Sequence, residues 1–104
     1  MKKQNLKSLF DPESIAIVGA SNKKGKIGTI ITENIMKLGY KGRVYLVNPS
    51  YKILKLKRCY SAPSSVGKPI DTAIVCVPAK FVFDVIKDGV KNVKNFVIIS
   101  AALS

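Results

Sequence analysis

A short apolar run, followed by a glycine and then by a helical pattern, constrains the fold of this chain most. Ser14–Val18 is almost continuously apolar and ends at Gly19, which is typical of a buried strand in a parallel sheet. Apolar residues then recur at helical spacing from Ile27 to Leu38, and Gly39 follows as a stop signal. The segment therefore predicts a strand, a glycine-bearing turn and a helix.

The same alternation continues along the chain. Arg43–Val47 and Thr72–Val77 are further apolar runs, each closed by a proline, and Ala79–Val90 has helical spacing. Phe96–Ile99 predicts a fourth strand. Alternating strands and helices favour parallel pairing through right-handed crossovers. The pattern predicts an α/β fold, a doubly wound parallel sheet with helices on both faces in three layers.

The segment from Ser50 to Ile70 is the least regular. We expect a short helix near Tyr51–Leu56 and a turn near Ser64–Gly67. The chain has 104 residues, enough for one domain, 1–104. Doubly wound domains usually continue after a fourth strand with another helix and strand. We therefore expect either that this domain is truncated at its C-terminus or that something else covers its last strand, which is expected near a sheet edge.

Charge and composition narrow the function classes. The net charge is +12, from 18 Lys plus Arg against 6 Asp plus Glu, which favours an anionic partner or simply a solvated basic surface. The lysines do not fall on one helix face and no nucleic-acid motif occurs, so a nucleic-acid partner is not expected. No apolar segment approaches the roughly 20 residues that span a bilayer, and no signal peptide is visible. We expect a cytoplasmic protein without a membrane partner.

Side chains that are absent limit the chemistry. The chain has no histidine, which excludes imidazole general-base catalysis, histidine metal ligation and a phosphohistidine within it. Cys59 and Cys76 do not form a metal or redox spacing, and Cys76 is interpreted as a small buried hydrophobic residue. No metal site and no catalytic residue are predicted.

The loop after the first strand is a candidate phosphate site. Ligands of open α/β sheets bind at the carboxyl ends of the strands. Gly19 is expected to permit the sharp turn, Gly25 a positive φ, and Gly28 close packing of the helix on the sheet. The helix N-terminus favours anions, and the Ser21 hydroxyl can donate a hydrogen bond. Three basic residues add charge: Lys23, Lys24 and Lys26. The loop matches neither G-x-G-x-x-G nor the P-loop, and a purely structural turn is the alternative.

The end of the second strand bears on the ligand. NAD-binding domains place an acidic residue there, against the ribose hydroxyls. Here Val47 is followed by Asn48 and Pro49 and, five residues after Val47, by Lys52, with no acid in reach. This favours a ligand with a phosphate on its ribose, a condition that NADP and coenzyme A (CoA) both satisfy. Asn48 and Pro49 can equally form an ordinary turn.

Several segments, in this order and at these intervals, resemble a known family. They are Asp11–Ser21, Gly39–Gly42, Val47–Pro49, Val77–Ala79 and Ile99–Ala101. Together they resemble the N-terminal CoA-binding domain of ADP-forming acyl-CoA (acetyl-CoA) synthetases, relatives of the succinyl-CoA synthetase α subunit. The resemblance covers nearly the whole chain, from about residue 9 to residue 101.

The resemblance implies a Rossmann-like fold and a binding site for CoA or acyl-CoA. The residues expected along the CoA phosphates are Gly19, Ala20, Ser21 and Lys26. Those expected at the adenine and ribose are Asn48 and Pro49, those beside the pantetheine are Val77, Pro78 and Ala79, and Ser100 is expected near the thiol. In these acid–thiol ligases a histidine of a later domain carries phosphate to ADP. The chain is therefore expected to need further domains or subunits of the synthetase for catalysis.

Two departures from the family pattern concern glycines. Family members usually have glycine where this chain has Ala102, and commonly have one before Cys59, where this chain has Leu56-Lys57-Arg58. Side chains at glycine positions strain or reshape the backbone. Two other functions stay open: a stand-alone regulatory domain that binds CoA or a nucleotide, and an NADP-type dinucleotide binder.

Overall fold

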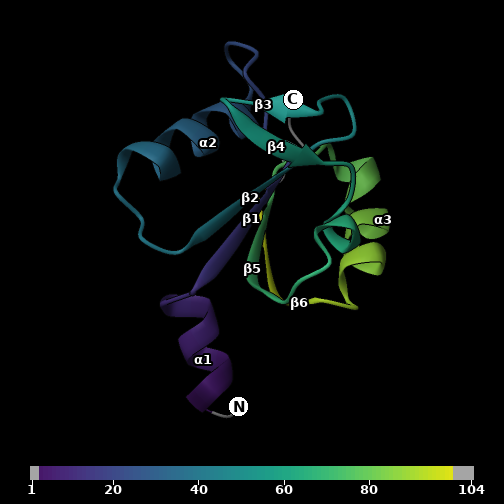
Figure 1. Ribbon diagram of the computed structural model, residues 1–104. Coiled ribbons are helices and arrows are strands. Elements are labelled where there is room, and N and C mark those ends of the chain that lie inside the picture. Colours follow the sequence, from purple (N-terminus) through teal and green to yellow (C-terminus); the bar gives the residue numbers. More distant parts are fainter. Residues whose placement is uncertain (1–2, 100–104) are drawn as a thin grey trace.

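The computed structural model describes the backbone of residues 3–99 and the side chains of residues 6–99. Six strands form one sheet in the order β3-β4-β2-β1-β5-β6, and every neighbouring pair is parallel except β3 and β4. The elements are α1 (Lys3–Phe10), β1 (Ser14–Val18), α2 (Ile27–Lys37), β2 (Arg43–Val47), β3 (Ile53–Leu54), β4 (Lys57–Tyr60), the 3-10 helix η1 (Pro63–Val66), β5 (Ile70–Val75), α3 (Ala79–Gly89) and β6 (Val93–Ile98). Figure 1 shows α2 on one side of the sheet and α3 with η1 on the other. The predicted doubly wound, three-layer α/β fold is confirmed.

The core lies in two layers, one on each face of the sheet. Along β1, Ile15 and Ile17 belong to one buried cluster and Ala16 and Val18 to the other. Side chains of a strand point alternately to its two faces, so a strand covered on both sides must be apolar throughout. Burial on both faces explains why the sequence of β1 is continuously apolar.

One predicted element is wrong. The short helix expected at Tyr51–Leu56 is instead the start of a β-hairpin, in which β3 pairs antiparallel with β4. The two residues between them, Lys55 and Leu56, have φ of +52° and +65°. Positive φ at both central residues is the geometry of a two-residue hairpin turn. Leu54, which is 1% exposed, anchors the hairpin in the core, and this tertiary contact outweighs the local preference.

The remaining elements lie close to their predicted positions. The predicted strand Thr72–Val77 is β5, and it begins and ends two residues earlier; the last strand begins at Val93 rather than Phe96. The expected turn near Ser64–Gly67 is confirmed as η1, which ends at Val66 and is followed by Gly67 in a left-handed conformation. β6 lies at the sheet edge, as predicted.

Helix α1 was not predicted from the sequence. It packs near the amino ends of β5 and β6, at the foot of the sheet in Figure 1. The Thr72 hydroxyl donates a 2.7 Å hydrogen bond to the Ser8 carbonyl, and the Asn95 amide donates to the Ser8 hydroxyl. Polar side chains of the strands thus fix a helix whose own apolar pattern is short. No helix within residues 3–99 is long and apolar enough to span a membrane.

Candidate functional site

The carboxyl ends of the three central strands lie level with one another. Val18 of β1 is in register with Val47 of β2 and with Val75 of β5. Beyond them, the Gly19 N–H donates a 2.8 Å hydrogen bond to the Val47 carbonyl, and the Cys76 N–H donates a 2.7 Å bond to the Val18 carbonyl. The loops after these three strands therefore start at one edge of the sheet, which is the edge where ligands of such folds bind.

Glycines allow the first loop to pack tightly against its neighbours. Gly19 has φ of +95°, and a Cβ there would lie 2.9 Å from the Cys76 carbonyl oxygen. A Cβ on Gly28 would collide with the Gly19 carbonyl, so the first turn of α2 lies directly against the end of β1. Gly25 has φ of +86° in open space. The conformations expected of the three glycines are confirmed.

Asn48 joins the first loop to the second. Its side-chain N–H donates a 2.8 Å hydrogen bond to the Ala20 carbonyl, and its side-chain oxygen accepts a 2.9 Å bond from the Ser50 N–H. The second bond forms an Asx turn just after β2. Asn48 thus has the turn-forming role considered for it, and it also fixes the position of the glycine loop.

Tyr51 is a site residue that sequence reasoning missed. Its hydroxyl lies 3.3 Å from the Ser21 hydroxyl and donates a 2.9 Å hydrogen bond to the Asn22 side-chain oxygen. The Ser21 hydroxyl also accepts a 3.0 Å bond from the Lys23 N–H. The hydrogen bond with Ser21 lowers the pKa of Tyr51 below its ordinary value. The available signal was an aromatic residue three positions after Asn48, within reach of the first loop.

The charge around the glycine loop is positive. Lys23, Lys24, Lys26 and Lys52 are exposed, and none of them pairs with a carboxylate within residues 6–99. Neither residues 19–28 nor residues 48–52 include an acid. Within the described region no side chain caps the N-terminus of α2, which begins after Lys26. Uncapped N–H groups and the helix dipole add to the positive potential of the lysines.

The third loop borders the same edge. Val77 lies beside Gly19: a Cβ placed on that glycine would be 3.3 Å from the Cγ1 of Val77. Pro78 and Ala79 are exposed where α3 begins. Burial raises the pKa of the Cys76 thiol to about 11, so this thiol is protonated at neutral pH. Cys76 is only partly buried, which corrects the interpretation of it as a buried residue.

The structure brings some predicted site residues into contact and leaves others on the rim. Gly19, Ala20, Ser21, Asn48 and Val77 meet around the ends of β1 and β2. Lys26, Pro49, Pro78 and Ala79 are exposed around them. Ser100, expected near the thiol of the ligand, lies outside the described residues, as do Ala101 and Ala102.

Comparison with known proteins assigns the family. Residues 13–104 match the profile of a family described as CoA binding domain. The chain is 38% identical to the α subunit of acetate–CoA ligase [ADP-forming] I of Pyrococcus furiosus, covering 93% of this chain and 22% of that protein. It is 41% identical to acetate–CoA ligase [ADP-forming] II of Archaeoglobus fulgidus, covering 96% of this chain and 15% of that protein.

The solved structures agree with this assignment. An acetyl-coenzyme A synthetase of Candidatus Korarchaeum cryptofilum, in complex with phosphate and ADP, superposes with a TM-score of 0.88 at 41% identity. The match covers 93% of this chain and 21% of that one, so this chain spans about a fifth of the synthetase. The chain belongs to the CoA-binding domain family, and its resemblance to the domain found in ADP-forming acyl-CoA synthetases is confirmed.

Proposed function

We propose that this chain binds CoA as the CoA-binding module of an ADP-forming acyl-CoA synthetase, with the CoA phosphates at the Gly19–Gly28 loop. One observation carries the proposal. The loop combines a tight glycine turn, an uncapped helix N-terminus and unpaired lysines, and it has no acid. Backbone N–H groups at a helix N-terminus and nearby cations are the donors that a pyrophosphate needs.

The second and third loops supply the rest of the proposed site. Asn48 and Pro49 border the adenine and ribose, and Lys52 offers a cation for the phosphate on the ribose. Because the loop after β2 has no carboxylate, nothing there repels that phosphate. Val77, Pro78 and Ala79 border the pantetheine.

We propose that further domains or subunits complete the reaction. The chain has no histidine, so it has no imidazole to accept a phosphoryl group. It spans 22% and 15% of the two ligases described above, so most of each of those proteins lies beyond the matched region. In this proposal the module holds CoA for a reaction that its partners catalyse.

Calorimetry with three ligands tests the proposal. CoA is expected to bind more tightly than dephospho-CoA, which lacks the ribose phosphate, and more tightly than NADP, which has it but lacks the pantetheine. No heat from CoA at submillimolar concentration, in a protein shown to be folded by circular dichroism, would contradict CoA binding. Equal affinities for CoA and dephospho-CoA would remove the ribose-phosphate argument alone. Tighter binding of NADP would favour the dinucleotide alternative.

A charge variant with a matched control localises the binding. Lys26→Gln removes a cation beside the proposed phosphates, and Lys87→Gln removes one from the exposed side of α3. Lys26→Gln is expected to weaken CoA binding about three-fold, the scale of one exposed ion pair, whereas Lys87→Gln leaves it unchanged. An equal loss in both variants would indicate only a general effect of net charge.

A further inference from the structure

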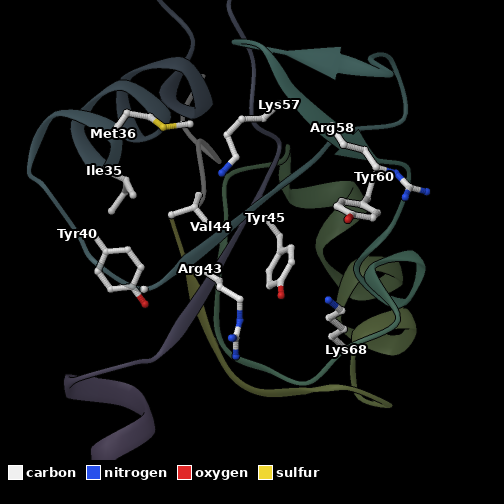
Figure 2. Close-up of a pocket in the computed structure, with 11 residues that line it drawn as sticks. Ile35, Met36, Tyr40, Arg43, Val44, Tyr45, Lys57, Arg58, Tyr60 and Lys68 are labelled. Atoms are coloured by element: carbon white, nitrogen blue, oxygen red, sulfur yellow. The ribbon is translucent and has the colours of Figure 1, made fainter.

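A cavity lies at the opposite end of β2 from the glycine loop. It has a volume of about 470 Å³ and is bordered by the start of β2, the start of β4 and the segment before β5. Figure 2 shows its lining residues. Its size is within the range of pockets that hold small molecules. The function proposed above does not use it.

The cavity exists because β4 separates from β2. The two strands pair only at Leu46 with Cys59 and at Val47 with Tyr60. The Arg43 N–H donates to the Glu13 carbonyl, and the Val47 carbonyl accepts from the Gly19 N–H. The backbone N–H and C=O groups of the odd-numbered residues of β2 therefore face β1. Those of Val44 therefore face the other way, toward the cavity that Val44 lines. A backbone N–H at the cavity wall can donate to an anion.

The lining is basic and aromatic. It includes both arginines of the chain, three of its four tyrosines, and two lysines, Lys57 and Lys68, but no acid among the described residues. Figure 2 shows Lys57 and Lys68 extending toward the cavity from opposite sides, with Tyr45 between them. Neither lysine pairs with a carboxylate within the described part of the chain. Cations that converge on a concave surface without partners concentrate anions there.

Arg58 and two tyrosine rings form one wall of the cavity. The Arg58 guanidinium lies 4.6 Å from the centre of the Tyr60 ring, and the rings of Tyr60 and Tyr45 meet edge to face at 6.1 Å. These contacts hold the aromatic wall in place. At Tyr40, burial of the ring and then the charges of Asp71 and Asp11 raise the pKa of the hydroxyl. The acids Asp71 and Asp11 act on the Tyr40 side, so an anion is expected away from Tyr40, between Lys57 and Lys68 (Figure 2).

We propose that this cavity is a second anion site, which takes a small polyphosphate, either free or carried by a nucleotide, between Lys57 and Lys68. The Val44 N–H and the Tyr45 hydroxyl supply neutral donors, and the tyrosine rings provide a surface on which a base can stack. This site and the glycine loop lie at opposite ends of β2, so the failure of one proposal leaves the other intact.

Amide chemical shifts of the full 104-residue chain test the proposal, with saturating CoA present to occupy the glycine loop. The probes are tripolyphosphate, ADP and adenosine, each at about 1 mM, a concentration that detects weak binding. Tripolyphosphate and ADP are expected to shift the amides of Val44 and Tyr45, and adenosine is not. Tighter binding of ADP than of tripolyphosphate would assign the nucleotide as the source of the phosphates.

Variants with a matched control complete the test. Lys57→Gln and Lys68→Gln are each expected to weaken tripolyphosphate binding about three-fold, and Lys87→Gln on α3 leaves it unchanged. Three results would overturn the proposal: no shift at Val44 in the folded protein, shifts confined to residues 19–28, or an equal loss in all three variants. A hexaglutamate peptide that shifts Val44 where tripolyphosphate does not would also overturn it, in favour of an acidic protein partner.

Discussion

The side-chain amide of Asn48 donates a 2.8 Å hydrogen bond to the carbonyl oxygen of Ala20. This bond ties the loop after β2 to the loop after β1, two segments that are 28 residues apart in the sequence. The position of the loop proposed to bind the CoA phosphates therefore depends on Asn48, a residue proposed to border the ribose. A change at Asn48 is therefore expected to affect both the fold and the ligand.

Asn48→Asp keeps the oxygen that accepts from Ser50 and replaces the donor to Ala20 with a second acceptor. We expect the free energy of unfolding to fall by about 1–2 kcal/mol, because the Ala20 carbonyl loses its partner and faces a carboxylate. CoA affinity is expected to fall as well, since the new charge repels the ribose phosphate. Urea unfolding and calorimetry measure the two effects. Unchanged stability would show that the Asn48 bond does not hold the loop.

Gly28→Ala is expected to destabilise the protein by roughly 1–3 kcal/mol, the cost of forcing a methyl group into a packed contact. Alanine normally stabilises a helix relative to glycine, by up to about 1 kcal/mol, so the expected sign is reversed here. The reason is the Gly19 carbonyl, a backbone atom that a Cβ on Gly28 would strike. Gly25→Ala is the control, because its Cβ meets open space and only its φ of +86° is strained. Urea unfolding should show the larger loss for Gly28→Ala, and a stabilised Gly28→Ala protein would contradict the packing described.

Ser21→Ala is expected to raise the pKa of Tyr51, because the hydrogen bond with Ser21 is the main cause of its lowering. A pH titration into the alkaline range, followed by the absorbance of tyrosinate, measures how the tyrosines ionise. The transition that is missing in Tyr51→Phe belongs to Tyr51. Tyr51 is expected to ionise at a lower pH in the wild-type chain than in Ser21→Ala. Identical titration curves would show that the two hydroxyls do not interact in solution. Tyr51→Phe is also expected to weaken CoA binding, because it releases Ser21 and Asn22 from Tyr51.

Leu56→Gly is expected to stabilise the protein by about 1 kcal/mol. Leu56 has φ of +65°, a conformation that costs residues with a Cβ about 1–2 kcal/mol and costs glycine almost nothing. Its side chain is 99% exposed, so its removal sacrifices no packing. Leu56→Ala keeps the strained conformation and serves as the control. Urea unfolding in which both variants have wild-type stability would contradict the strain assigned to this turn.

The spacing of apolar residues and glycines was sufficient to predict those elements that bury a continuous run or one face of apolar side chains. β1 and α2 could be located because their apolar spacing matches a strand and a helix, and Gly19, Gly25 and Gly28 because glycines mark turns and close contacts. The β3–β4 hairpin could not be predicted, since its turn has no glycine and its anchor, Leu54, is fixed by the tertiary core. The same limit applies to the site: Tyr51 reaches Ser21 only because β1 and β2 are neighbours in the sheet.

The central claim is that CoA phosphates bind at the loop between β1 and α2. The most direct measurement is a titration of the ¹⁵N-labelled chain with CoA, followed by amide chemical shifts. We predict that the largest shifts occur in residues 19–28, with smaller shifts at Asn48 and Lys52. Saturable shifts that leave residues 19–28 unmoved, or no shifts at millimolar CoA in a folded protein, would contradict the claim.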